Sequence, residues 1–440
     1  MLRHRLRYAL LTLPTIALLA AGDWPQWRGP RGDSTSDDHQ LPLRWSEQSG
    51  VVWKTALPEW GTSTPAIWAN GLFVTSHEEE TIGALLLLKL DKRSGKIEWT
   101  RKVGSGQANR EERPIAEGSK RKSQKFHRLH NLASPSPVTD GERVIVHFGN
   151  GDLVAFDFSG TELWRRNLQD DHGAYTIWWG HANSPVIAGD LVISVCMQDS
   201  LEQFGPPLSP SYLVAHDKRT GEEKWKTMRM TNAKLEECDS YTTPILVQNG
   251  VRTELVVWGG DQVDAYNPAT GKQLWFLPGQ AKLRTITGPT AGHGRVYVTR
   301  GKSGALLAVS LGGDGKLPPD RVAWQSEKST PDSCCPVLWK DLLFIVSDNG
   351  VAQCLDAHTG VVHWTQRIPG EYKASPLAAA GHIYFLNTTG LCTVVAAADR
   401  FQKVSENKID DDTIASPAVS GGRIFLRGKR AIYAIGSHAP

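Results

Sequence analysis

The chain has 440 residues, of which 40% are hydrophobic and 22% charged, and its 42 glycines and 25 prolines are an ordinary share. This composition excludes fibrous and disordered proteins. The formal net charge of +3 arises within the first 22 residues, where Arg3, Arg5 and Arg7 face no acidic residue. The rest of the chain is neutral, which argues against a nucleic-acid-binding protein.

Residues 1–22 have the features of a secretory signal. A basic start precedes an apolar run from Tyr8 to Ala21, and the small residues Ala20 and Gly22 precede a cleavage position that would leave Asp23 first. An uncleaved membrane anchor is the alternative, but this run is shorter than the roughly 18 residues that a spanning helix needs. We therefore expect an exported protein, periplasmic or extracellular, with an N-terminal extension over residues 23–50.

A unit of about 50 residues repeats along the remaining chain. It consists of Ser/Thr-Pro, a hydrophobic run, a segment of the form Ala-x-Asp-x-x-Thr-Gly, and a Trp, and one clear copy runs from Ser184 to Trp225. The prolines that open the eight units are Pro65, Pro137, Pro185, Pro244, Pro289, Pro336, Pro376 and Pro417. The terminal Trp recurs as Trp53, Trp99, Trp164, Trp225, Trp275, Trp324 and Trp364, with Val404 in the eighth position.

The hydrophobic runs, such as Arg143 to His147, are short and bounded by Gly, Asn and Asp, which predicts β-strands. A period of about 40 to 50 residues with four short strands is typical of a propeller blade. We predict an all-β fold, an eight-bladed β-propeller of four-stranded blades over residues 51–436. The last unit lacks its Trp strand, so Val51 to Lys54 should complete it by pairing with Ala431 to Ile435, which removes exposed sheet edges.

The motif at Ala215 to Trp225, with variants at 90–99, 155–164, 265–275 and 355–364, resembles the repeat of the quinoprotein (pyrroloquinoline quinone, PQQ) family. The opening Trp-Pro-Gln-Trp-Arg-Gly-Pro at residues 24–30 also resembles the mature start of many secreted bacterial proteins with these repeats. The resemblance implies the propeller fold. It leaves the function open, because the family includes quinoprotein dehydrogenases as well as non-catalytic propellers such as the outer-membrane barrel assembly lipoprotein.

Three long insertions, at 101–133, 165–183 and 197–211, lie on one face of the predicted propeller. In the second, Trp178 and Trp179 are expected to anchor a partner. The first is either a solvated loop or a contact for an anion or a partner, since it carries seven basic residues: Arg110, Arg113, Lys120, Arg121, Lys122, Lys125 and Arg128.

Residues just ahead of each unit should point to the mouth of the central channel, where a ligand or partner would bind. The alternative is that they cap the sheets or bind water. These positions are Trp60, His130, Asn131, His181, Asp239, Tyr241, Arg284, Cys334 and Lys373. His127 and His130 have a spacing seen in metal sites, but no second pair accompanies them, and we predict no metal site.

Cys334 and Cys335 are adjacent, with Cα atoms about 3.8 Å apart, so a disulfide between them would be strained. They form either such a bridge or two reduced thiols. In quinoprotein alcohol dehydrogenases, which the repeats resemble, an adjacent-Cys disulfide stacks on the cofactor, but it lies early in the chain, whereas this pair opens the sixth unit.

The resemblance to quinoprotein dehydrogenases would require Ca²⁺ ligands, an aspartate base, cations for the cofactor carboxylates and an aromatic platform. Asp239, Arg284, Lys373 and Trp178 are of these types, but no stretch matches the active-site segments of that family. We therefore predict a non-catalytic, monomeric, envelope-associated scaffold without a cofactor, which binds a protein or a small anionic ligand on the face with the insertions. The alternative is a PQQ-dependent alcohol or sugar dehydrogenase that holds PQQ and Ca²⁺ at the channel mouth.

Overall fold

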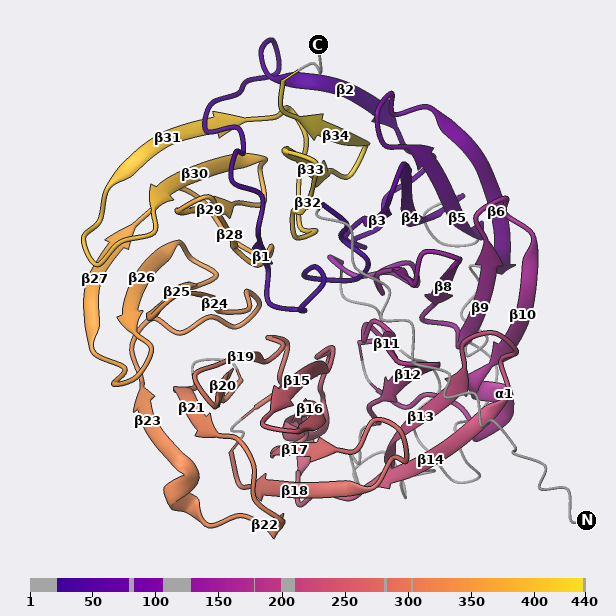
Figure 1. The fold of residues 1–440 in the computed structure, drawn as a ribbon, viewed down its shortest axis with the longest axis vertical. Helices are drawn as coiled ribbons and strands as arrows, with labels where there is room; N and C mark the ends of the chain where they lie inside the picture. The colour runs from indigo at the N-terminus through magenta and orange to yellow at the C-terminus, as the bar shows by residue number, and fades with distance from the viewer. Residues whose placement is uncertain are drawn as a thin grey trace, which may run out of the picture.

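The computed structural model describes residues 22–78, 83–105, 128–177, 179–198, 210–280, 283–301 and 304–437. Within these residues the strands form eight sheets of four or five strands, arranged as a ring around a centre (Figure 1). The prediction of an eight-bladed all-β propeller is thus confirmed. The predicted signal up to residue 21 and the basic stretch at 106–127 lie outside the described residues. No helix in the described ranges has the length and apolar character needed to cross a membrane.

The first four blades follow one another in chain order. Blade one contains β3 (Ala66–Trp68), β4 (Gly71–His77), β5 (Ala84–Asp91) and β6 (Ile97–Ser105). Blade two contains β7 (Val138–Thr139), β8 (Arg143–His147), β9 (Asp152–Asp157) and β10 (Glu162–Asn167), and helix α1 (Leu168–His172) follows it. Blade three contains β11 (Val186–Ala188), β12 (Leu191–Cys196), β13 (Ser211–Asp217) and β14 (Glu223–Arg229), followed by the 3₁₀ turn η2 (Leu235–Cys238). Blade four contains β15 (Ile245–Asn249), β16 (Arg252–Gly259), β17 (Gln262–Tyr266) and β18 (Gln273–Pro278), with the added strand β22 (Gly315–Lys316).

The last four blades continue the ring. Blade five contains β19 (Thr290–Gly292), β20 (Arg295–Thr299), β21 (Leu306–Ser310) and β23 (Val322–Ser326), which the 3₁₀ turn η3 (Pro319–Arg321) precedes. Blade six contains β24 (Val337–Trp339), β25 (Leu342–Val346), β26 (Val351–Asp356) and β27 (Val362–Arg367). Blade seven contains β28 (Leu377–Ala379), β29 (His382–Leu386), β30 (Leu391–Ala396) and β31 (Lys403–Lys408), with β1 (Thr35–Ser36) added at its inner edge. Blade eight contains β32 (Ala418–Ser420), β33 (Arg423–Arg427), β34 (Ala431–Ile435) and β2 (Val51–Ala56).

Blade eight is built from both ends of the described chain. β2 pairs antiparallel with β34, with Val51 opposite Ile435 and Ala56 opposite Ala431. The N-terminal strand therefore supplies the outer strand that the last repeat lacks. This sheet then has the four strands that every blade contains, so the last blade is not left one strand short.

The repeat Trp and the Thr-Gly glycine meet across neighbouring blades. Trp164 Nε1 in blade two donates to the Lys218 carbonyl in blade three at 2.9 Å, and a Cβ at Gly221 would lie 2.7 Å from the same indole. Trp275 instead donates to Glu254 of its own blade. The donation to the next blade is also made by Trp53, Trp99, Trp225, Trp324 and Trp364. The motif therefore joins blades: glycine leaves room for an indole that fills the space between two sheets.

The residue before each opening proline joins the blades at the inner rim. The Ser136 N–H in blade two donates to Ser184 Oγ in blade three at 2.9 Å. In blade six this position is held by Cys335, whose Sγ accepts from the Gly288 N–H at 3.0 Å. The same backbone-to-side-chain bond links Thr64 with Ser136, Ser184 with Thr243, Cys335 with Ser375, and Ser375 with Ser416.

The N-terminal extension crosses the inner ends of the blades. Figure 1 shows this indigo segment passing through the middle of the ring, and β1 within it pairs with β28 of blade seven. Arg28 in the same segment is fully buried, and its guanidinium donates to the carbonyls of Pro289 and Pro336, at 2.8 Å each, and to Thr290 Oγ1 at 2.6 Å. These acceptors belong to blades five and six, so the extension ties several blades together across the channel.

Candidate functional site

The blade connections divide between the two faces of the ring. Because neighbouring strands are antiparallel, the connections from an outer strand to the next inner strand lie on the same face as those between the second and third strands of a blade. The three long insertions follow β6, β10 and β12, so all three belong to this face. We call it the loop-rich face.

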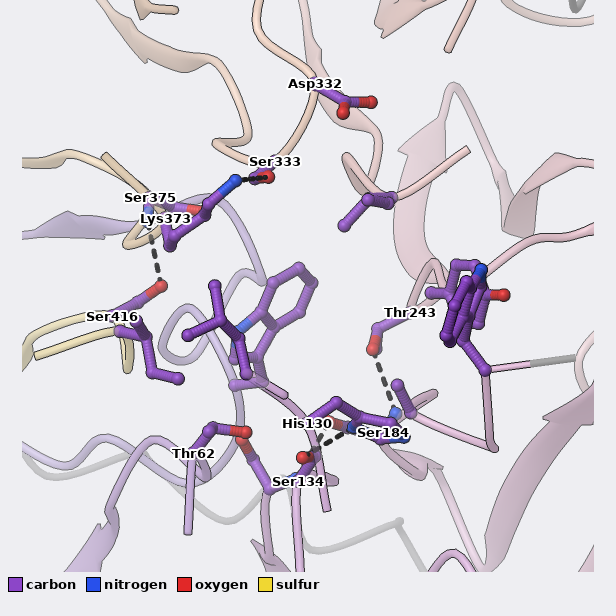
Figure 2. A pocket seen from close by; sticks show the side chains of 18 of the residues that line it. Thr62, His130, Ser134, Ser184, Thr243, Asp332, Ser333, Lys373, Ser375 and Ser416 are labelled. Carbon is purple, nitrogen blue, oxygen red and sulfur yellow. Dashed lines mark hydrogen bonds between the residues drawn. The ribbon is translucent and has the colours of Figure 1, made fainter. Parts of the chain in front are cut away.

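A cavity of about 520 Å³ lies at the centre of the loop-rich face (Figure 2). Every blade contributes to its wall through the connection that precedes its inner strand, and Trp27 from the N-terminal extension also lines it. The wall residues used below are Trp27, Thr62, Leu129, His130, Ser134, Ser136, Trp179, Ser184, Tyr241, Thr243, Arg284, Ile286, Asp332, Ser333, Lys373, Ser375, Ile414 and Ser416.

Hydroxyl groups of the inner-rim ring form part of the wall. They come from Ser136, Ser184, Thr243, Ser375 and Ser416, and each accepts an N–H from the preceding blade. Figure 2 shows the contacts between Ser184 and Thr243 and between Ser375 and Ser416, on opposite sides of the cavity. Since a hydroxyl both accepts and donates, each can still donate its proton to a ligand.

Arg284 and Lys373, the cations of the wall among the described residues, are bound to carboxylates. Arg284 donates to Glu236 at 2.9 Å and to Asp332 at 2.8 Å, and Lys373 Nζ lies 2.5 Å from Asp348 Oδ2. Burial raises the pKa of Asp332, although the Arg284 guanidinium opposes this shift. The part of the wall that the structure describes therefore carries charged groups but little uncompensated positive charge.

Apolar side chains complete the wall. Trp27 and Trp179 contribute indoles, and Leu129, Ile286 and Ile414 contribute aliphatic groups. A concave site with a mainly apolar wall and a few oriented polar groups is the usual form of a ligand pocket. This cavity can therefore hold a ligand that is partly apolar and offers hydrogen-bond acceptors.

The structure brings five of the twelve predicted site residues to this cavity: His130, Trp179, Tyr241, Arg284 and Lys373. Trp60 instead lines a neighbouring cavity of about 230 Å³. Trp178 lies outside the described residues. The other predicted residues do not line the described wall of the central cavity: Asn131, His181, Asp239, Cys334 and Cys335.

Three of these residues support the connections around the cavity. The Asn131 amide donates to the Trp60 carbonyl at 2.9 Å and so joins two connections. His181 is buried and stacks on Tyr175, with ring centroids 5.1 Å apart. Asp239 is buried, and its carbonyl accepts from the Thr285 N–H in the next connection at 2.9 Å.

Cys334 and Cys335 are fully buried free thiols, so of the two alternatives the structure has the reduced pair. Cys335 takes the place of the Ser or Thr at the inner rim, and Cys334 belongs to the core between blades six and seven. Burial raises the pKa of Cys334, and the nearby Asp348 acts in the same direction. The pair therefore offers no surface on which a cofactor in the central cavity could stack.

The sequence reasoning missed Trp27, Asp332 and the hydroxyl ring. A signal for the ring was present, because Ser/Thr-Pro recurs at almost every unit start and equivalent positions of a closed repeat must form a circle. Asp332 lies two residues before Cys334 and thus adjoins a predicted position. Trp27 had no such signal, since the path of the extension across the channel follows from contacts with distant blades.

Comparison with known proteins places the repeats in a family. The model of the family described as outer membrane protein assembly factor BamB, with PQQ-like repeats, matches residues 43–204, 209–333 and 316–408. The chain belongs to this family. No curated protein matches the sequence.

Solved structures with the same fold include both BamB and quinoprotein dehydrogenases. BamB from Moraxella catarrhalis has a TM-score of 0.56 at 14% identity, over 88% of this chain and 99% of that chain. Quinohemoprotein alcohol dehydrogenase from Comamonas testosteroni has a TM-score of 0.65 at 14% identity, over 96% of this chain and 82% of that chain. A europium-containing methanol dehydrogenase has a TM-score of 0.60 at 13% identity, over 93% and 90%. At such identities the likeness concerns the fold alone.

The described residues of the central cavity do not fit PQQ with Ca²⁺. Ca²⁺ requires several carboxylate, amide or carbonyl oxygens, and the carboxylates of PQQ require cations. Both cations of the wall already bind protein carboxylates. In the described ranges, one group of three His, Cys, Asp or Glu side chains is close enough to share a metal, and it does not line this cavity.

Proposed function

We propose that this protein is an exported, non-catalytic scaffold of the cell envelope that binds a protein partner on its loop-rich face, with a segment of the partner in the central cavity. The observation that carries the proposal is the wall of this cavity. It combines donor hydroxyls and apolar side chains with cations that already have partners.

This combination suits a peptide segment. Main-chain carbonyls of a peptide would accept from the ring hydroxyls, and an apolar side chain would pack on Trp27 and Trp179. The proposal also draws support from the family, whose description names an assembly factor for outer-membrane proteins. Export rests on the signal-like residues 1–22.

The test is site-specific photocrosslinking in the native envelope. A photoreactive amino acid at Thr62 or Ile414 lies on the cavity wall, and the matched control is Val251, which is fully exposed in the turn between β15 and β16 on the opposite face. We expect one discrete protein adduct from each cavity position and none from Val251. An equal pattern from both faces, or no adduct at either cavity position, would contradict the proposal.

A PQQ-dependent dehydrogenase remains the alternative function, since solved dehydrogenases share the fold. Purified protein is titrated with PQQ and Ca²⁺ and assayed for alcohol- or sugar-dependent reduction of an artificial acceptor. We expect neither saturable quinone binding nor turnover. Turnover that is lost on changing both Cys334 and Cys335 to Ser would establish the enzymatic function instead.

A further inference from the structure

Three potential metal ligands converge at the junction of blades five and six. His293 follows β19 in blade five, while Asp341 and His358 follow β24 and β26 in blade six. Asp341 Oδ1 lies 3.1 Å from His358 Nε2 and 3.5 Å from His293 Nε2. One ligand atom from each side chain lies within 4.8 Å of the others. These connections belong to the face opposite the central cavity.

The backbone holds the three side chains in place. His293 has a φ of +53°, and Lys340, at the corresponding position of blade six, has the same value. A left-handed residue of this kind fixes a tight hairpin turn. Arg295 in blade five donates to the His358 carbonyl at 2.6 Å and so binds the connection that follows β26 to blade five. The arrangement therefore rests on turns between packed strands rather than on long loops.

The side chains are also accessible. The exposed fractions of the side chains are 28% for His293, 69% for Asp341 and 48% for His358. An ion can reach them from solvent without opening the fold. The His293 and His358 rings have centroids 4.4 Å apart, and His293 Nε2 also lies 2.9 Å from the Lys340 carbonyl, a contact that a bound ion would replace.

We propose that His293, Asp341 and His358 bind a divalent transition metal ion of the Zn²⁺ type. Two imidazole nitrogens and one carboxylate oxygen form a donor set that suits such ions, whereas Mg²⁺ and Ca²⁺ prefer oxygen ligands alone. Metal bonds of about 2.0 to 2.2 Å place tetrahedral ligand atoms roughly 3.4 Å from one another, so the two distances from Asp341 to the histidines already suit such an ion, and the exposed rotamers permit the remaining adjustment. Three protein ligands leave a fourth position for water or for an external ligand.

The bound ion would connect blade five to blade six. Arg295 and the neighbouring Lys340 add positive charge beside the ligands, so we expect a dissociation constant in the micromolar range rather than the nanomolar range. The proposal does not depend on the function of the loop-rich face, because it concerns different residues on the other side of the ring.

The test is calorimetric titration of chelator-treated protein with Zn²⁺, with Mg²⁺ as a second arm. The variants are His293→Ala and His358→Ala, and the matched control is His382→Ala, a histidine on the same face of blade seven whose ring contacts the Ala380 carbonyl. We expect one Zn²⁺ site in the wild-type protein and in the control. Each variant should bind at least about tenfold more weakly, and Mg²⁺ should give no such site.

Thermal melting gives a second readout. Zn²⁺ should raise the melting temperature of the wild-type protein and of His382→Ala, because it binds the folded state, but not that of the double variant without His293 and His358. Melting curves without metal verify that all variants fold. Equal Zn²⁺ affinity in the double variant and the wild-type protein, or no binding at about 100 μM Zn²⁺, which lies well above a micromolar dissociation constant, would overturn the proposal.

Discussion

Replacing Arg28 with alanine should loosen the N-terminal extension from blades five and six. The guanidinium is fully buried and donates to Pro289, Thr290 and Pro336, as well as to Ser34 Oγ at 3.0 Å. An alanine would remove all of these donors. It would leave two carbonyls and a hydroxyl at the inner rim without the partner that they have in the native chain.

The expected loss in the free energy of unfolding follows from the hydrogen bonds that the charged guanidinium donates. A hydrogen bond from a charged group contributes about 1.5 to 3 kcal/mol, but water entering the vacated space would satisfy part of the lost contacts. The acceptors are neutral carbonyls and hydroxyls, so the net loss corresponds to about two such bonds once water has satisfied the others. We therefore expect Arg28→Ala to lower the free energy of unfolding by about 3 to 5 kcal/mol. The stability of Arg28→Lys should lie between those of the wild-type protein and Arg28→Ala, because one ammonium group cannot reach all of the acceptors.

Arg31 provides the control within the same segment. Its side chain is 46% exposed and pairs with Asp33 and Asp37 at the surface, so Arg31→Ala should cost no more than about 1 kcal/mol. Urea unfolding with a reversibility check measures both variants, and limited proteolysis detects release of the segment. If Arg28→Ala is no less stable than Arg31→Ala, the extension does not hold the blades together and the reasoning is wrong.

Three further predictions concern the ring itself. Gly221→Ala should destabilise the protein more than Gly189→Ala in urea unfolding, because both glycines have positive φ but only at Gly221 would a Cβ collide with Trp164; equal losses would contradict the packing of indole on glycine. Burial lowers the pKa of Arg427 to about 9, so Arg427→Met should leave the stability unchanged or raise it by about 1 to 4 kcal/mol, and a clear loss would show that this charge is compensated. Burial also lowers the pKa of His147 to about 3. Between about pH 6.5 and 3 this histidine is therefore protonated in the unfolded chain but neutral in the folded protein, so the free energy of unfolding decreases as the pH is lowered through that window. His147→Gln should remove up to about 1.4 kcal/mol per pH unit of this slope, as measured by unfolding at several pH values, and an unchanged slope would exclude this histidine as its source.

The repeat in the sequence was sufficient to predict the fold. Trp and Thr-Gly recur at a constant spacing because each indole packs on the glycine of the next blade, so the motif records a contact between blades. The same logic predicted that β2 would complete blade eight, where it pairs with β34. Local turn chemistry and periodicity carry this information, and neither requires knowledge of distant contacts.

The site was harder to predict, because its residues acquire their roles from neighbours far along the chain. Arg284 and Lys373 were expected as cations at the channel mouth, but their acidic partners come from other connections and leave little free charge. Cys335 stood out as half of an unusual pair, although it occupies the position of a rim hydroxyl. His293, Asp341 and His358 are separated by 17 to 65 residues, and only the register of adjacent blades brings them together.

We propose that the loop-rich face binds a protein and that its cavity does not hold a quinone. The most direct test of this proposal is to purify the protein from its native envelope under gentle conditions and to record a native mass spectrum together with an absorbance spectrum. We expect a defined complex with another polypeptide and no quinone absorbance. One quinone per chain, without any bound polypeptide, would contradict the proposal.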